Sequence, residues 1–330
     1  LMEFGLRRAQ GHSAGLWGAR AAMIGGFNGT SNVEAGKQFG IPVLGTMAHS
    51  WVMSFDEEID AFREYVRQYH DNLILLADTY NVLEMGVPHA IQVFKELKEE
   101  GRLPGKYGIR IDSGDIAYLS QEATRMFTEA GFPDVIISGS NDLDEYTIQS
   151  LKAQGCTVTS WGVGTKIITA DGTSALGGVF KMAVKEADGK EVPVMKFSND
   201  VEKMTNPGIK TVYRFYKKDT GKMITDLVCL HDEKAADGGD FTLVTESAKW
   251  RRKELKAGTY TVEELLRPVV ENGRNLPLPA LFEIIRYADK QMDTLWPEYT
   301  RLLNPDLMEI NLSDKLQTLK SELIRRELGE

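Results

Sequence analysis

The chain has only two cysteines, Cys156 and Cys229, and neither belongs to a CxxC pair. It has no apolar run of membrane-spanning length, and no signal-peptide pattern opens it. It also lacks an excess of positive charge, because 39 Lys and Arg stand against 48 Asp and Glu, a net charge of −9. These absences argue against a disulfide scaffold, a membrane-spanning protein and a broad nucleic-acid-binding face. We therefore expect free thiols in a reducing compartment, with the cytoplasm as the location.

What the chain does have is the composition of an ordinary globular protein. Of its 330 residues, 42% are apolar and 26% are charged. This is enough material for one large α/β domain or two smaller domains. An acidic protein of this kind still binds anions where a few arginines and backbone amides converge.

Short apolar runs alternate with amphipathic stretches from residue 1 to about 188. The runs are Leu73–Ala77, Tyr107–Ile111, Val135–Ile137 and Thr157–Trp161. Between them lie stretches with helical spacing, such as Ile59 to Tyr69, for which Ser54 or Asp56 is the predicted N-cap. Buried parallel strands covered by helices produce this pattern, and a repeat of about 25–35 residues is typical of βα units. The sequence predicts an α/β fold whose strands form a closed or nearly closed irregular barrel over residues 1–188.

The pattern changes after the predicted barrel. Residues 189–260 contain the strand-like runs Val192–Phe197 and Thr211–Tyr216, and the turn Lys218–Gly221 precedes a third run, Met223–Leu230. We expect an antiparallel, β-rich part of a second domain here. Residues 261–330 are expected to be largely helical, with an amphipathic helix over Asp314–Leu328.

His49 is the sharpest single candidate for chemistry. It follows the apolar run Pro42–Leu44 and Gly45–Thr46, so it is expected at the carboxyl end of a strand, where barrel enzymes place their reactive groups. An imidazole there can act as a base, a nucleophile or a phosphoryl acceptor. The alternative is a structural histidine bonded to neighbouring backbone. The other four histidines lack such a setting and are expected to be structural or on the surface.

A charged cluster follows two other predicted strands. Arg110 belongs to a strand that ends at Asp112, and Asp78 ends the run before it. A guanidinium suits a carboxylate or phosphate, and the two aspartates suit Mg²⁺ or ribose hydroxyls. The alternative is an Arg–Asp ion pair that only ties loops together.

Two late strand ends carry glycine and hydroxyl side chains. The first has Ser138, Gly139 and Ser140, and the second has Gly162, Gly164 and Thr165. Glycine allows a ligand to approach the backbone, so exposed amides and hydroxyls can hold a phosphate. Either loop alone is commonly just a turn, but two in succession at late strand ends favour phosphate binding.

In these motifs the chain resembles nicotinate phosphoribosyltransferases of the bacterial type. The resemblance covers almost the whole chain, and the matching segments, in order, are Glu3–Gly11, Gly26–Val33, Gly45–Ser50, Gly108–Asp115, Ser138–Ser140, Gly162–Thr165, Leu176–Lys181, Leu302–Pro305 and Asn311–Leu316. It implies the irregular α/β barrel of the type II phosphoribosyltransferases with a second domain, assembled as a homodimer with shared active sites. It also implies synthesis of nicotinate mononucleotide and pyrophosphate from nicotinate and phosphoribosyl pyrophosphate, in NAD biosynthesis, with coupled ATP hydrolysis and Mg²⁺.

The resemblance also implies residue roles. His49 would be the histidine that ATP phosphorylates, and Arg110 would hold the nicotinate carboxylate with Ser31 and Thr46. Arg7 would bind the product phosphate or the pyridine region. The two late loops, with Thr165, would hold phosphates of the phosphoribosyl donor. Asp78 and Asp112 would bind Mg²⁺ or ribose hydroxyls.

Ser31 distinguishes the acid from the amide as substrate. The related nicotinamide enzymes carry an aspartate at this place in the motif, and a carboxylate would repel nicotinate, whereas a hydroxyl can donate to it. Nicotinamide phosphoribosyltransferase is therefore the nearest alternative within the enzyme class.

Two further alternatives stay open. A sugar-phosphate aldolase or isomerase would need a reactive lysine, for which Lys166 and Lys181 are the candidates. Family members carry a further N-terminal portion ahead of the segment matching Glu3–Gly11, and we expect it to be missing here. It supplies an aromatic residue that stacks on the pyridine ring of the neighbouring subunit, so an inactive fragment or binding subunit is the second alternative.

Overall fold

The chain is divided into two compact units in a computed structural model. The structure describes residues 1–69, 71, 73–198, 203–235, 239–245 and 252–329. Unit 1 comprises Leu1–Ala175 together with Leu281–Ile285, and unit 2 comprises Leu176–Ala280 and Arg286–Glu330. The division predicted from the sequence, at 188 and 260, stays a prediction.

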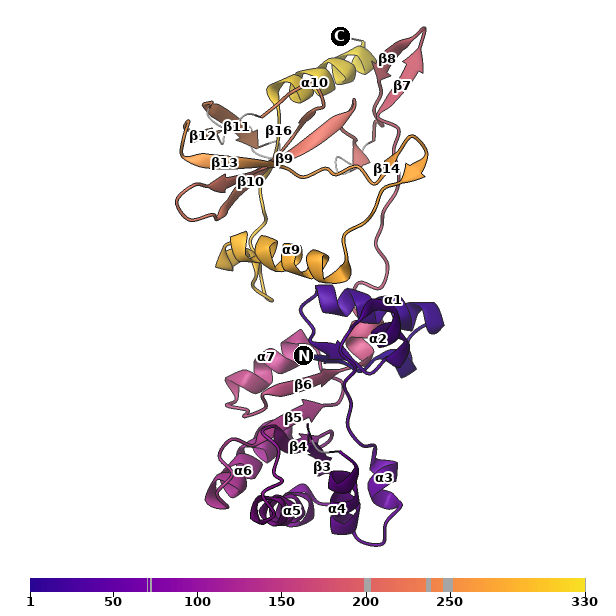
Figure 1. Ribbon diagram of the computed structural model, residues 1–330. Coiled ribbons are helices and arrows are strands. Elements are labelled where there is room, and N and C mark those ends of the chain that lie inside the picture. The colour runs from indigo at the N-terminus through magenta and orange to yellow at the C-terminus, as the bar shows by residue number, and fades with distance from the viewer. Residues whose placement is uncertain (70, 72, 199–202, 236–238, 246–251, 330) are drawn as a thin grey trace. The chain divides into compact units, whose positions relative to one another are not determined.

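Unit 1 alternates strands and helices, as the sequence predicts (Figure 1). Its strands are β1 (Met2–Glu3), β2 (Gly29–Thr30), β3 (Leu73–Leu76), β4 (Tyr107–Ile111), β5 (Ile136–Ser140) and β6 (Ser160–Val163). Its helices and turns are η1 (Leu6–Arg8), α1 (His12–Ile24), α2 (Val33–Phe39), α3 (His49–Met53), α4 (Glu58–Gln68), η2 (Val82–Gly86), α5 (Val87–Glu99), α6 (Ile116–Glu129), α7 (Glu145–Ala153) and α8 (Thr165–Ile168).

The six strands form one parallel sheet in the order β2-β1-β6-β5-β4-β3. The predicted α/β fold with a parallel sheet is confirmed. The sheet is a curled half barrel: β3 ends it on one side, and beyond β2 it continues only through an isolated parallel bridge between Thr30 and Val43, so the two sides do not pair with each other among the described residues. The expectation of a nearly closed barrel is therefore corrected. Closure depends on strand number and tilt, which a run of βα patterns does not specify.

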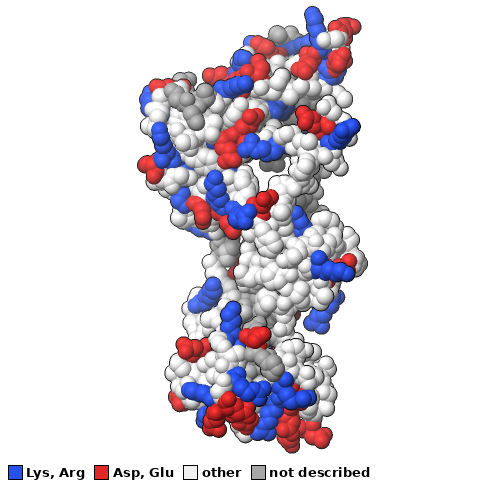
Figure 2. Space-filling model, viewed as in Figure 1, with Lys and Arg blue, Asp and Glu red and all other residues white. Residues whose placement is uncertain are grey.

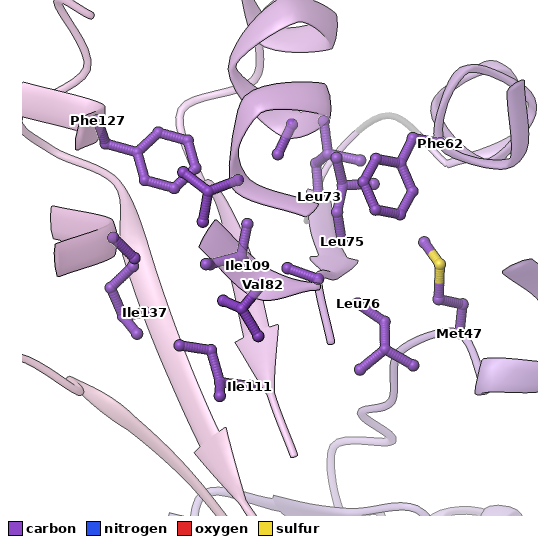
Figure 3. Close-up of a cluster of buried hydrophobic side chains, with 14 of the residues drawn as sticks. Met47, Phe62, Leu73, Leu75, Leu76, Val82, Ile109, Ile111, Phe127 and Ile137 are labelled. Atoms are coloured by element: carbon purple, nitrogen blue, oxygen red, sulfur yellow. The ribbon is translucent and has the colours of Figure 1, made fainter. Parts of the chain in front are cut away.

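The larger of two apolar clusters in the described part of unit 1 packs against β3, β4, β5 and β6. Ile109 and Ile111 of β4 lie beside Ile137 of β5, together with Phe127 of α6 (Figure 3). Residues two apart on a strand face the same side, so Gly108 and Arg110 face the opposite side. This alternation separates the packed face of β4 from the face that carries Arg110.

The helix predicted around Ile59 is present as α4, but its predicted cap is wrong. Its N-cap is Glu57, whose side chain makes no capping hydrogen bond. The Ser54 hydroxyl instead donates to Trp51 O at 2.7 Å. The Ser54 side chain thus bonds to the preceding short helix α3 and does not cap α4.

Gly108 is expected to tolerate no side chain. A Cβ atom there would lie 1.9 Å from the carbonyl oxygen of Ile136 on the neighbouring strand. Since backbone cannot yield as a flexible side chain does, Gly108→Ala should lower the free energy of unfolding by about 3 kcal/mol. Urea unfolding would measure this, with Gly105→Ala as the control, because a Cβ at Gly105 meets nothing within 4 Å. Equal unfolding midpoints in the two variants would contradict this close strand packing.

Unit 2 is built on a mixed sheet in the order β12-β11-β16-β10-β9-β13 (Figure 1). Its strands and hairpins are β7 (Val184–Ala187), β8 (Lys190–Pro193), β9 (Lys210–Lys217), β10 (Met223–Leu230), β11 (Phe241–Thr245), β12 (Arg252–Leu255), β13 (Tyr260–Glu264), β14 (Val270–Glu271), β15 (Arg274–Asn275) and β16 (Ile310–Leu312). The remaining elements are α9 (Leu281–Thr294), whose first five residues cluster with unit 1, η4 (Pro297–Tyr299) and α10 (Asp314–Leu328).

The sequence located several of these elements. The predicted hairpin is confirmed, because β9 and β10 pair antiparallel around the turn at 218–221. The predicted helix over Asp314–Leu328 is α10, capped by the Ser313 side chain. The run Val192–Phe197 continues as a strand only to Pro193 within β8. The described residues 261–329 contain α9 and α10, but also most of β13 and the short strands β14, β15 and β16.

The surface and the thiols agree with the composition. Figure 2 shows Lys and Arg interspersed with Asp and Glu on the face it presents, without a large field of one sign. Cys156 and Cys229 are both free, which confirms the predicted thiols, and burial raises the pKa of the Cys229 thiol to about 12. In the part of the chain that the structure describes, no helix has the length and apolar character needed to span a membrane.

Candidate functional site

The carboxyl ends of the unit 1 strands surround one cavity of about 400 Å³. In a parallel sheet these ends lie at the same edge, so residues distant in sequence meet there. The lining residues are Phe4, Arg7, Arg8, Ser31, Gly45, Thr46, Met47, Ala48, His49, Arg110, Asp112, Ser140, Asn141, Asp142, Gly162, Gly164 and Thr165.

Most of the residues singled out from the sequence line this cavity. They are Arg7, Ser31, Thr46, His49, Arg110, Asp112, Ser140, Gly162, Gly164 and Thr165. Three do not line it: Asp78, Ser138 and Gly139. A Cβ at Gly139 would face Val158 and Ile116 on the packed side of the sheet, because Gly139 is one residue out of step with Ser138 and Ser140.

His49 begins α3 and is held from two sides. Its Nδ1 lies 3.2 Å from the Thr79 hydroxyl, and its Nε2 lies 3.6 Å from Asp112 Oδ2 and 4.0 Å from Asp78 Oδ1. The side chain is 39% exposed. The ring therefore contacts side chains from the ends of β3 and β4 and keeps a face open to the cavity. A histidine tied to backbone would have neither feature.

Asp78 lies beneath the cavity floor. Its Oδ2 accepts hydrogen bonds from the Asp112 N–H at 3.0 Å and from the Ser113 hydroxyl at 2.6 Å. Its Oδ1 is buried and has no hydrogen-bond partner. A buried carboxylate oxygen without a donor is costly, which makes a cation or a ligand donor favourable at this point.

Arg110 bridges two walls of the cavity. One terminal nitrogen donates to the Thr46 hydroxyl, and the other lies 3.6 Å from Asp112 Oδ2. Asp112 also accepts a hydrogen bond from the Ser140 hydroxyl. The ion pair expected as an alternative is thus present, but it lies inside the cavity and not between outer loops.

Two further polar atoms at or beneath the cavity floor have no hydrogen-bond partner. The Nε of Arg110 and the hydroxyl oxygen of Ser138 are both buried without a partner. They lie on adjacent strands, since Arg110 and Ser138 are register partners of β4 and β5. Incomplete hydrogen bonding of this kind is rare in a packed core and common at functional sites.

The two late loops differ in how they approach the cavity. After β5 the backbone turns through Asn141 and Asp142, both with positive φ, 98° and 37°. Near the end of β6, Gly162 makes room for the ring of Phe4, since a Cβ there would lie 2.7 Å from it. Small residues therefore bring backbone and an aromatic ring to the cavity surface.

Eight residues at or next to the cavity were not among the predicted site residues. Seven line it, namely Phe4, Arg8, Gly45, Met47, Ala48, Asn141 and Asp142, and Thr79 contacts His49. Arg8 had a signal, because it adjoins Arg7, and Thr79 adjoins Asp78. Phe4 could be recognised only once β1 was known to run between β2 and β6.

The other histidines and the candidate lysines lie elsewhere. His12 contacts Glu34 at 2.6 Å on the surface, His89 contacts the buried Glu58 at 2.8 Å, and His70 lies outside the described residues. The hydrogen bond and charge of Asp171 raise the pKa of Lys166, opposite to what an amine nucleophile needs. Lys181 is exposed and belongs to unit 2. Neither lysine lines the cavity, which disfavours an aldolase site.

Glu58 is a buried carboxyl group whose pKa is affected by Asp78. Burial raises the pKa of Glu58, the hydrogen bond and charge of His89 oppose this, and the Asp78 charge raises it further.

The described residues contain no group of three or more His, Cys, Asp or Glu side chains arranged to hold a metal ion by themselves. Mg²⁺ is commonly held by one or two carboxylates, with water and substrate phosphates completing its shell. The unpartnered Asp78 Oδ1 and the cavity-lining Asp112 fit that mode.

Sequence comparison places the chain among known proteins. The model of the nicotinate phosphoribosyltransferase (NAPRTase) family matches residues 1–235, and the nicotinate phosphoribosyltransferase C-terminal domain matches residues 209–320. Nicotinate phosphoribosyltransferase of Bacillus subtilis is 41% identical over 327 residues, which cover 98% of this chain. The human protein of that name is 31% identical over 377 residues and 98% of this chain.

The solved structures agree with the sequence comparison. The crystal structure of human nicotinic acid phosphoribosyltransferase is similar with a TM-score of 0.77 at 29% identity, covering 98% of this chain and 70% of that one. The chain spans 65% of the length of the Bacillus subtilis protein and 68% of the human sequence.

Proposed function

The chain belongs to the nicotinate phosphoribosyltransferase family, and on that premise we propose that its cavity joins nicotinate to the ribose of phosphoribosyl pyrophosphate. The products are nicotinate mononucleotide and pyrophosphate, a step of NAD biosynthesis. The observation that carries the proposal is that His49, Arg110 and the two late glycine loops line one cavity.

The nicotinate carboxylate is assigned to Arg110, Thr46 and Ser31. Arg110 supplies a charged donor, and Thr46, already its hydrogen-bond partner, supplies a hydroxyl from the opposite wall. Ser31 lines the same cavity and can donate a further hydrogen bond. The ring of Phe4 offers an apolar surface against which a pyridine can pack.

The phosphates are assigned to the other wall. Arg7 is exposed at the cavity and can pair with the phosphate of the nucleotide. Gly162, Gly164 and Thr165 offer backbone and a hydroxyl to phosphates of the donor, and Ser140 continues that wall. Ser138 and Gly139 belong to β5, which leads to Ser140, and are assigned only a supporting role through its backbone.

Asp78 and Asp112 are assigned to Mg²⁺ or to ribose hydroxyls. A bound Mg²⁺ would neutralise charge on the departing pyrophosphate. Asp112 is oriented for this by the Ser140 hydroxyl and by Arg110, and Asp78 is oriented by Ser113. These contacts hold the two carboxylates in place before the substrate arrives.

His49 is assigned as the acceptor of a phosphoryl group from ATP. Positive charge develops on the ribose carbon when pyrophosphate leaves, and a phosphate on His49 would add negative charge near that carbon. Thr79 holds the ring through Nδ1. Coupled ATP hydrolysis would then favour the forward reaction.

Pyrophosphate release tests the proposed function. The purified chain is incubated with phosphoribosyl pyrophosphate, ATP and Mg²⁺, with nicotinate or nicotinamide. Release that requires nicotinate supports the proposal. Release only with nicotinamide would favour the amide enzyme, and no release with either would favour the inactive fragment or binding subunit.

Ser31→Asp is expected to weaken the use of nicotinate. A carboxylate at this cavity wall repels the substrate carboxylate, and we expect KM for nicotinate to rise roughly tenfold or more. Ser54→Asp is the matched control, because it adds the same charge on an exposed residue outside the cavity. Equal or better nicotinate turnover in Ser31→Asp would contradict the role of Ser31.

The homodimer with shared active sites and the cytoplasmic location stay predictions from the resemblance and the composition. A homodimer would be visible as a doubled mass in sedimentation or light scattering.

A further inference from the structure

Glu3 is a charged residue on an interior strand of the unit 1 sheet. It ends β1, which pairs with β2 on one side and β6 on the other, and it is 0% exposed. Burying a carboxylate is unfavourable unless hydrogen bonds compensate for the lost water. The partners of Glu3 therefore indicate its role.

Both carboxylate oxygens of Glu3 accept hydrogen bonds from buried donors. Oε1 accepts from the N–H of Gly5, and Oε2 accepts from the Thr30 hydroxyl at 2.5 Å. Thr30 is also 0% exposed, and its hydroxyl oxygen accepts from the N–H of Asn32 at 3.0 Å. We call Glu3 and Thr30 the buried clasp.

One end of the buried clasp holds the turn that carries Arg7 and Arg8, which we call the arginine turn. Gly5 begins this turn, and its carbonyl accepts from the N–H of Arg8 at 2.7 Å. A Cβ at Gly5 would lie 2.4 Å from Ile168, so the turn is pressed closely against α8. Fixing the Gly5 amide thus fixes the backbone from which Arg7 and Arg8 reach the cavity.

The other end holds Ser31. The N–H of Ser31 donates to the carbonyl of Glu3 at 3.0 Å, and Ser31 lies between two members of the hydrogen-bond chain, Thr30 and Asn32. The side chain of Asn32 accepts from Ala35 and so begins α2. Ser31 is therefore anchored on both sides.

The hydrogen-bond partners of Glu3 require a carboxylate at this position. Its two partners, an amide N–H and a hydroxyl, both donate, and a carboxylate has acceptors at both positions. Glutamine has one acceptor and one donor, so it would turn its NH₂ group toward one of the two donors. Replacement by glutamine should release either the arginine turn or Thr30.

We propose that Glu3 and Thr30 are positioning residues that set the spacing between Arg7 and Ser31, and hence the length of ligand that spans the cavity. This rests on the proposed function, in which Arg7 binds the nucleotide phosphate and Ser31 faces the carboxylate. The buried clasp therefore affects the affinity for a ligand that carries both a phosphate and a carboxylate. It has little effect on the affinity for either group alone, since each group can still bind its own residue.

Binding of three ligands tests the proposal: nicotinate mononucleotide, nicotinate and inorganic phosphate, titrated calorimetrically into the full chain. Glu3→Gln and Thr30→Val should each raise Kd for the mononucleotide about tenfold or more. Kd for nicotinate and for phosphate should change less than about threefold. Thr30→Ser keeps the hydroxyl and should keep the wild-type Kd, and Glu34→Gln is the control for the same change on an exposed carboxylate.

Amide hydrogen exchange provides a readout that is independent of activity. Exchange should speed up at Gly5 or Asn32 in Glu3→Gln and at Asn32 in Thr30→Val, and at neither amide in Glu34→Gln. Equal weakening of all three ligands, unchanged mononucleotide binding, or unchanged exchange would each overturn the proposal. If Glu3→Gln does not fold, the comparison of Thr30→Val with Thr30→Ser decides.

The proposed function can fail separately. A wild-type chain that binds no mononucleotide would overturn the proposed function and the ligand-spacing role together. A wild type that binds it normally, with variants that bind it equally well, would overturn only the clasp.

Discussion

Replacing His49 with alanine is expected to abolish ATP-dependent phosphorylation of the chain and to remove the stimulation of nucleotide synthesis by ATP. Among the described residues that line the cavity, His49 is the only histidine. No other imidazole of these lining residues can therefore take its place. The ring of His49 is held by Thr79 and lies 4.0 Å from Asp78 and 3.6 Å from Asp112. Labelling with γ-labelled ATP should fall to background, and the ATP-stimulated rate should fall to the rate without ATP.

The matched control is His12→Ala. His12 belongs to the same unit but has a 71% exposed side chain paired with Glu34. It should keep both labelling and stimulation. Acid-labile label retained in His49→Ala, or an unchanged dependence on ATP, would contradict the assignment of His49.

Replacing Arg110 with lysine is expected to weaken nicotinate binding by about thirtyfold, which corresponds to about 2 kcal/mol. Lysine keeps the positive charge but cannot form two parallel hydrogen bonds to a carboxylate. The single ammonium group of lysine also cannot reproduce both contacts of the guanidinium, the hydrogen bond to Thr46 and the approach to Asp112. The effect should appear as a higher KM for nicotinate, with KM for phosphoribosyl pyrophosphate nearly unchanged.

Arg63→Lys is the control for this substitution. Arg63 makes two hydrogen bonds to Glu96 on the surface of unit 1, outside the cavity. It should leave both KM values unchanged. An equal rise of both KM values in Arg110→Lys would show instead that Arg110 supports the whole cavity, as a loop-tying ion pair would.

Several parts of this protein were determined by local sequence. The run Tyr107–Ile111 is β4 without a change of boundary, and Asp314–Leu328 is α10. Both succeed because side-chain period and a capping residue act over neighbouring residues. The chemistry near the strand ends was readable for the same reason, since Arg110 lies within the run Tyr107–Ile111 and His49 comes five residues after Leu44.

Other parts followed only from the resemblance or from the tertiary structure. The roles of Ser31 and Arg7 come from the resemblance, because a lone serine or arginine carries no local pattern. β1 and β2 have two residues each, too few for a period, and their places in the sheet depend on pairing with each other and with β6. The open half barrel likewise depends on strand pairing across the whole sheet.

The tertiary structure alone decided which polar groups meet. Thr79 contacts His49 across 30 residues, and Thr30 contacts Glu3 across 27, and nothing in either local sequence indicates its partner. The sequence determined the elements and the chemistry at their ends, because those depend on neighbours along the chain. The fold determined the floor of the cavity and the clasp behind it, because a buried polar group is stable only where distant strands bring its partner within hydrogen-bond distance.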